Sequence, residues 1–176
     1  MDLKTSLLEA PTPEWHQRHT QYVLEDKKRF HDLMRYILAT PDGNYRLNQR
    51  ATLILLDVER HQPIWIEEQI GAMCDHLHRD LPVALKRNLL RVLQNHQIPE
   101  SRWGKVADEC FYFLGSHDEP IAVKVFAMSV LHGLTRHIPE LAPELRYLIE
   151  EQFPYGSAGF KSRGRKVLAA LTKAGY

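Results

Sequence analysis

The sequence has little of what marks a secreted, membrane or nucleic-acid-binding protein. Cysteine occurs twice in 176 residues, which excludes a disulfide framework and favours two buried thiols in a reducing compartment. No apolar run approaches a length of about 18 residues, which a membrane span needs. The first residues also lack the apolar core of a signal peptide. The formal net charge is only +1, so no strong field steers the chain toward nucleic acid or anionic lipid. We therefore expect a cytoplasmic protein whose partner is neither a membrane nor a nucleic acid.

Motifs for metal binding, phosphate binding and catalysis are also missing. The ten histidines include no pair at i, i+4 spacing with a carboxylate beside it, which is the arrangement that a metal site on a helix needs. The segment GSAGFKSRGRK, residues 156–166, lacks the spacing of a P-loop. No nucleophile and base, and no pair of carboxylates, stand at a recognisable spacing. We expect no cofactor and no metal, and these absences argue against an enzyme.

What the sequence does have is helical periodicity from end to end. Apolar residues recur about every 3.6 positions between turns rich in glycine and proline, and no stretch alternates with period two between hairpin signals. Thr12-Pro13 combines an N-cap with proline at the first helical position, whereas PDGN at 41–44 predicts a turn. The segment 120–137 has almost no polar face, so we expect it to be covered on most sides. The predicted helices are 13–25, 27–40, 45–61, 63–78, 83–95, 101–114, 120–137, 141–153 and 160–173.

One phrase occurs twice. HDEPIAVKVFAM at 117–128 repeats the pattern of RDLPVALKRNLL at 79–90. In each copy an aspartate in the turn precedes a lysine in the following helix by six positions. A polar turn residue followed by a cation at the same distance also occurs outside the two copies, and the four cations are Arg50, Lys86, Lys124 and Arg163. The nearly equal intervals between successive cations predict a repeat of two antiparallel helices whose apolar faces are buried by stacking.

This repeat resembles the HEAT and armadillo class of α-solenoids. The phrase D-x-P-hydrophobic-A-hydrophobic-K is similar to the HEAT pattern, in which a turn aspartate precedes Val-Arg or Val-Lys. The resemblance implies one all-α domain over residues 1–176, with a tail (1–12), a capping helix (13–26) and about four helix pairs (27–173) in a right-handed superhelix. It also implies a structural ladder of charge pairs between repeats, formed here by Asp80, Lys86, Asp118 and Lys124.

The resemblance also implies a function, because such stacks bind partners along an extended concave surface. We expect a non-enzymatic scaffold for a protein or peptide whose identity the sequence does not give. The second helices of the central pairs carry polar residues at helical spacing, and these form the predicted groove: Arg87, Arg91, Gln94, His132 and Arg136. The alternative is that these side chains simply face solvent.

A second candidate site lies at the start of the last predicted helix. The segment 156–166 mixes glycine with the cations Lys161, Arg163, Arg165 and Lys166. Backbone amides at a helix start can hold a phosphate, so these residues form a candidate anion site. The alternative is that they pair with acidic side chains of the preceding helix, 141–153.

Two other functions have weaker support in the residues. HEAT-like alkylpurine DNA glycosylases use tryptophan and aspartate around a flipped base, and the segment SRWGKVADECF contains both residues. However, Gly104 follows Trp103 and Asp108 comes five positions later, so the Trp-Asp-x-x-Asp arrangement of that family is not reproduced. A lyase of the adenylosuccinate type is the third candidate. It has the least support, because the Gly-Ser-Ser loop and the Met-Pro-x-Lys motif of those enzymes are missing from this sequence. A nucleic-acid-binding or base-processing protein is therefore the alternative to a scaffold.

Overall fold

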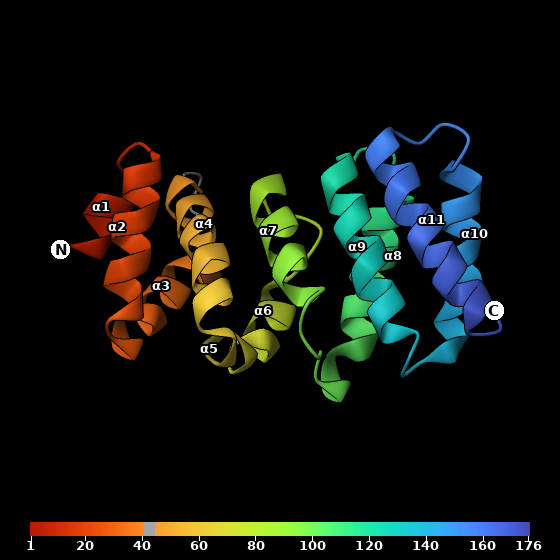
Figure 1. Ribbon diagram of the computed structural model, residues 1–176, viewed down its shortest axis with the longest axis horizontal. Coiled ribbons are helices and arrows are strands. Elements are labelled where there is room, and N and C mark those ends of the chain that lie inside the picture. Colours follow the sequence, from red (N-terminus) through yellow and green to blue (C-terminus); the bar gives the residue numbers. More distant parts are fainter. Residues whose placement is uncertain (41–44) are drawn as a thin grey trace. The chain divides into compact units, whose positions relative to one another are not determined.

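The computed structural model describes residues 1–40 and 45–176, and within them every regular element is a helix (Figure 1). The all-α prediction is thus confirmed, whereas the right-handed sense of the superhelix stays a prediction. Each predicted helix begins within two residues of an observed one. The predicted turn at 41–44 lies outside the described residues.

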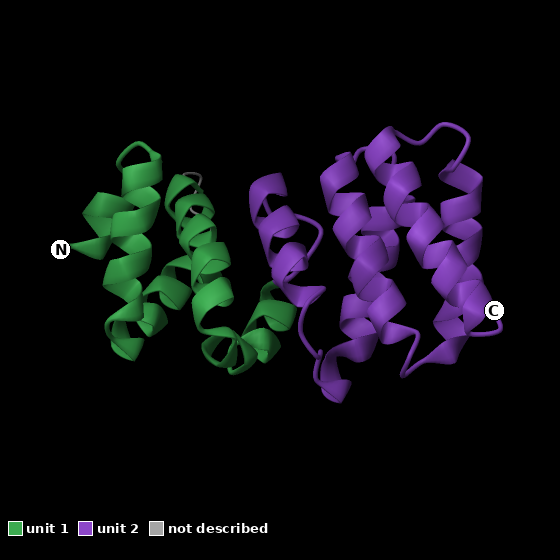
Figure 2. Cartoon of the chain, viewed as in Figure 1, with its two compact units in different colours: residues 1–76 green, residues 77–176 purple. Residues whose placement is uncertain are grey.

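The chain divides into two compact units, residues 1–76 and 77–176 (Figure 2). Unit 1 contains α1 (Leu3–Leu7), α2 (Pro13–Leu24), α3 (Lys27–Leu38), α4 (Arg46–His61), α5 (Pro63–Glu67) and α6 (Ile70–His76). Unit 2 contains α7 (Val83–Leu93), η1 (Glu100–Arg102), α8 (Trp103–Gly115), α9 (Ile121–Leu134), η2 (Pro139–Leu141), α10 (Ala142–Gln152) and α11 (Ala158–Lys173). Cys74 is buried in unit 1 and Cys110 in unit 2, each as a thiol.

The predicted tail, residues 1–12, contains the short helix α1. Leu3 and Leu7 of this helix are buried, and the indole nitrogen of Trp15 donates a hydrogen bond to the carbonyl of Ser6 at 3.0 Å. A guanidinium nitrogen of Arg50 in α4 donates to the carbonyl of Leu7 at 3.3 Å. A helix of five residues is too short to be stable alone, so these tertiary contacts hold it in place.

The segment predicted as one helix, 63–78, forms two helices, α5 and α6. The interruption falls at Glu68 and Gln69, where the carboxylate of Glu68 pairs with the ammonium of Lys27 at 2.7 Å. Ile66 and Ile70 on either side are both buried. Apolar periodicity is therefore kept across the break, which is why the sequence did not reveal it.

In unit 2, α7, α9 and α11 lie in the near layer of Figure 1, and α8 and α10 lie behind them. Helix α9 packs against α7, α8, α10 and α11. Its own buried residues are distributed between Val123 and Leu134. This agrees with the prediction that it is covered on most sides. The helix ends at Leu134 rather than at 137, which leaves Arg136 and His137 in the following turn.

Gly164 allows α11 to lie close to α10. A Cβ atom at this buried position would be 3.0 Å from Cγ2 of Ile149 and 3.3 Å from Cε2 of Phe153. Both distances are below ordinary van der Waals contact, so a side chain here would separate the two helices. The preceding residue, Arg163, lies about 100° away around α11, because the helix has 3.6 residues per turn, and it lines a cavity described below.

A buried imidazole at the contact between α1 and α2 makes the stability of unit 1 dependent on pH. Nδ1 of His19 donates to the carbonyl of Trp15 at 2.8 Å, and Nε2 is buried with no hydrogen-bond partner in the described part of the chain. A proton on Nε2 would place a positive charge in this buried contact, where its desolvation is costly. Burial therefore lowers the pKa of His19 below its ordinary value near 6.5.

We expect the free energy of unfolding to fall as the pH drops below about 6.5. The unfolded chain then binds a proton at His19 before the folded chain does, so the stability is fully present above that pH and is lost toward the lower folded pKa. One such group contributes a slope of at most about 1.4 kcal/mol per pH unit. Urea unfolding at pH 7.5 and pH 5 checks this, with His19→Leu as the comparison. An equal fall in stability in both proteins would contradict it.

Candidate binding groove

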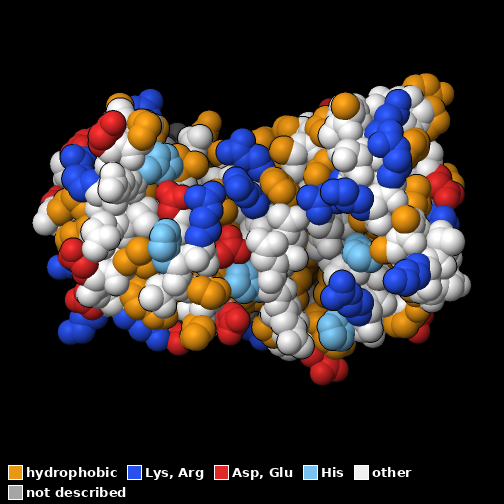
Figure 3. All heavy atoms as spheres, viewed as in Figure 1, with side chains coloured by type: hydrophobic (Ala, Val, Ile, Leu, Met, Phe, Trp, Pro, Cys, Tyr) orange, Lys and Arg blue, Asp and Glu red, His pale blue; other side chains and the backbone are white. Residues whose placement is uncertain are grey.

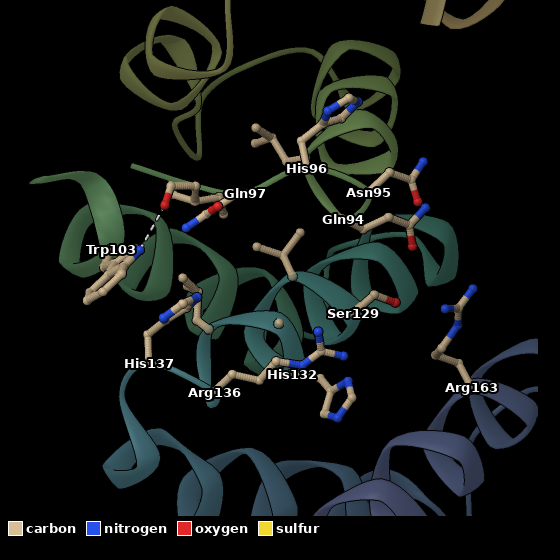
Figure 4. Close-up of a pocket in the computed structure, with 15 residues that line it drawn as sticks. Gln94, Asn95, His96, Gln97, Trp103, Ser129, His132, Arg136, His137 and Arg163 are labelled. Atoms are coloured by element: carbon tan, nitrogen blue, oxygen red, sulfur yellow. Dashed lines mark hydrogen bonds between the residues drawn. The ribbon is translucent and has the colours of Figure 1, made fainter. Parts of the chain in front are cut away.

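The candidate site is a cavity of about 570 Å³ that lies entirely within unit 2. Its walls come from the C-terminal end of α7 and the segment after it, the start of α8, the second half of α9 with its turn, and α11. Figure 4 shows Gln94, Ser129, His132, Arg136 and Arg163 around this space. We call this cavity the groove.

Two guanidinium groups give the groove its positive character. Arg136 comes from the turn after α9 and Arg163 from α11. Among the residues that the structure describes, neither guanidinium makes an ion pair or a hydrogen bond with a side chain. Burial and the positive charge of Arg136 lower the pKa of His132, which is half-buried and lies beside Arg136 (Figure 4). Within residues 1–40 and 45–176, no aspartate or glutamate lines the groove.

An aromatic stack closes one end of the groove. The rings of Trp103 and His137 are 4.7 Å apart at an interplanar angle of 19°, and the Trp103 indole nitrogen donates to the carbonyl of Ile98 at 2.9 Å (Figure 4). One face of the indole and its only donor are therefore already used within the fold. Asp108 is exposed and does not line the groove.

The predicted groove residues are partly brought together. Gln94, His132 and Arg136 line the cavity, but Arg87 and Arg91 do not. Nε of Arg87 contacts Oδ1 of Asn88 at 3.3 Å. Arg91 is exposed, and its carbonyl accepts a hydrogen bond from the Gln94 side chain at 3.1 Å.

The predicted anion site divides among separate surroundings. Arg163 lines the groove, whereas the Lys161 ammonium donates to the carbonyl of Pro154 at 3.2 Å. The Arg165 guanidinium lies 5.8 Å from the ring centroid of Phe153, and Lys166 is exposed. The Ser157 side chain accepts from the backbone nitrogen of Phe160 at 3.3 Å, so the start of α11 is capped by the chain itself. No ion pair joins these cations to the acids of α10 in the described part of the chain.

The two lysines of the predicted ladder are buried at the starts of α7 and α9. The Lys86 ammonium donates to the carbonyl of Arg79 at 3.1 Å and to Oε1 of Glu119. The side chains of Lys86 and Glu119 are 6% and 8% exposed. The Lys124 ammonium donates to the side-chain oxygen of Gln152 at 2.8 Å, and burial lowers the pKa of Lys124.

The acidic partners differ from the predicted ones. Asp80 and Asp118 are both exposed, and the carboxylate at Lys86 belongs to Glu119, one residue after Asp118. The aspartate in the turn faces solvent, whereas the next side chain points toward the buried ammonium. Each lysine thus links its own helix to the following helix pair. Lys86 of α7 contacts the turn before α9, and Lys124 of α9 contacts the end of α10.

Sequence reasoning missed that Arg163 belongs with the α9 residues. Arg163 is the next cation of the recurrence after Lys124, and its position at a predicted helix start suggested an anion site. Trp103 and His137 also went unconnected, because nothing in their spacing reveals a ring stack between the start of α8 and the turn after α9.

Two further properties of the structure bear on function. The described residues contain no group of three or more His, Cys, Asp or Glu side chains placed to hold a metal ion. No helix within residues 1–40 and 45–176 has the length and hydropathy needed to span a bilayer.

Comparison with known proteins agrees with the helical repeat. The family model described as HEAT repeat domain matches residues 4–171. Neither the curated proteins nor the solved structures contain a significant match. The family match covers nearly the whole chain, both units included, and so shows that this protein belongs to the HEAT repeat family.

Proposed function

We propose that the protein is a non-enzymatic scaffold and that a protein or peptide partner docks in the groove between α7, α9 and α11. The observation that carries this proposal is the convergence of polar side chains from separate helices on one cavity of about 570 Å³. A cavity of this size with a few convergent polar groups is typical of a binding site. HEAT-type stacks use such surfaces to bind their partners.

The chemistry of the lining supports binding rather than catalysis. The one hydroxyl from α9, on Ser129, donates to the carbonyl of Val125 at 2.9 Å. It is therefore not activated by the His132 imidazole, as a nucleophile would need to be. The carbonyl of His132 accepts from the Thr135 hydroxyl at 2.8 Å, which fixes the backbone at this end of α9. These contacts fix the wall of the groove and leave the Ser129 hydroxyl bonded within its own helix.

Comparative co-purification tests the proposal. The wild-type protein and the variants Arg136→Glu and Arg165→Glu are used to capture partners from the native lysate. Both substitutions change the net charge equally, but only Arg136 lines the groove. We expect a partner that wild type and Arg165→Glu retain and Arg136→Glu loses. A partner retained equally by all three would show that it binds another surface.

A further inference from the structure

We infer that the segment that docks in the groove is an acidic peptide, whose carboxylates bind the guanidinium groups of Arg136 and Arg163. This inference rests on the proposed function, because it names the chemistry of the ligand that the same groove takes. Three observations support it: the positively charged lining of the groove, a second hollow that continues beyond the cavity, and aromatic side chains that are already bound within the fold.

Arg136 and Arg163 differ from two other arginines of unit 2, Arg79 and Arg146, which each have a carboxylate partner. Arg79 lies 3.4 Å from the carboxylate of Glu109, and Arg146 lies 3.0 Å from that of Glu150. Arg136 and Arg163 have no such partner among the described residues, and no acidic side chain lines the cavity they share. A guanidinium presents a planar fork of donors that matches a carboxylate. No carboxylate of the described chain occupies the donors of these two residues, so both are accessible to a carboxylate-bearing ligand.

The positive surface continues beyond the cavity. A second hollow of about 390 Å³ shares His132 and Arg136 with the groove and extends along the end of α11. Its lining includes Lys173 and the apolar side chains of Pro139 and Leu171, but no aspartate or glutamate of the described chain. A small anion would fill neither hollow. An extended peptide with acidic and apolar side chains would fit both, since Arg136 stands between them.

The aromatic residues argue against single-stranded nucleic acid as the ligand. Proteins that bind single strands offer open aromatic faces on which bases stack, together with a long basic track. Here the Trp103 ring is already stacked on His137, and its N–H group is bonded to the backbone. The formal net charge of the chain is only +1, so its cations are local rather than continuous. Figure 3 shows that Lys and Arg side chains of this face lie interspersed with other residue types.

The test is fluorescence anisotropy with a labelled hexaglutamate peptide at physiological salt. We expect saturable binding to the wild-type protein, weakened about tenfold or more by Arg136→Glu and by Arg163→Glu, because each leaves a carboxylate without its partner. Arg165→Glu lies on the same helix as Arg163 and carries the same change in charge, so it should alter the affinity less than about twofold. Arg136→Gln and Arg163→Gln serve as milder variants, and circular dichroism checks the fold of each protein.

Three outcomes would overturn the inference: no saturable binding of hexaglutamate, equal weakening by Arg165→Glu, or tighter binding of a hexathymidylate strand than of the peptide. The co-purification experiment separates this failure from that of the proposed function. If hexaglutamate does not bind but Arg136→Glu still loses a partner, the groove is a docking site for another chemistry. If hexaglutamate binds as expected but no partner is lost, the proposed function fails and the acidic specificity of the groove stands.

Discussion

Replacing Glu119 with alanine is expected to lower the free energy of unfolding by about 3–5 kcal/mol, the usual cost of removing one member of a buried ion pair. The variant would leave the Lys86 ammonium, whose side chain is 6% exposed, with one backbone carbonyl as its acceptor. The nearby Phe113 ring, with its centroid 5.3 Å from the ammonium nitrogen, offers only weak compensation. Urea denaturation followed by circular dichroism measures the effect.

The matched control is Asp118→Ala. Asp118 is adjacent in the sequence and carries the same charge, but it is exposed, so we expect a change within about 0.5 kcal/mol. The double variant Lys86→Met, Glu119→Leu replaces the pair by apolar side chains, and it should recover most of the lost stability. Equal effects of Glu119→Ala and Asp118→Ala would contradict the assignment of Glu119 as the ladder carboxylate.

Trp15→Ala is expected to destabilise unit 1 by about 3–5 kcal/mol, the range for removing a large buried aromatic side chain. Trp15 is 2% exposed, its ring centroid lies 4.3 Å from that of His19, and its N–H group bonds to α1. The substitution removes both the packing and the side-chain hydrogen bond that joins α2 to α1. Calorimetry or urea unfolding gives the loss of stability.

Trp15→Phe separates the two contributions. Phenylalanine keeps most of the apolar volume but leaves the Ser6 carbonyl without its donor, so we expect a smaller loss of about 1–3 kcal/mol. Limited proteolysis reports on α1 directly, because release of this helix would expose its buried residues Leu3, Ser6 and Leu7 to cleavage. If both variants unfold at the wild-type midpoint, Trp15 does not hold α1 to α2.

The helix boundaries could be predicted where the signal is local. Thr12 and Pro13 set the start of α2 through a side-chain cap and a proline at the first position, and the cap is present at 3.1 Å. The short helix α1 was missed because its stability comes from Trp15 and Arg50, which are distant in the sequence. Local helix propensity does not depend on such contacts, so it could not predict this helix.

The ladder shows the same limit at the level of single residues. The repeat spacing identified Lys86 and Lys124 as recurrent cations, because helical periodicity fixes which side of a helix a residue occupies. It could not choose between Asp118 and Glu119. In a turn the side-chain direction depends on the backbone path, and one residue separates an exposed carboxylate from a buried one.

The candidate groove was predictable along the repeat but not across it. The offset that aligns Lys86 with Lys124 also aligns Gln94 with His132, and these last two line the cavity. Arg163 lies on α11, and the orientation in which α11 packs on α9 decides whether Arg163 or Arg165 faces the groove. That orientation depends on packing between helices, and it cannot be predicted from the spacing of residues within one helix.

The close approach at Gly164 makes the position of α11, and with it that of Arg163, depend on a residue that does not line the groove. Gly164 faces Ile149 of α10 and Phe153, the residue that follows this helix, whereas its neighbour Arg163 lines the groove. Any larger residue at 164 would move α11 away from α10 and shift the Arg163 guanidinium with it. Ligand preference can therefore diverge among related chains through a residue that the ligand never touches, while all groove side chains stay the same.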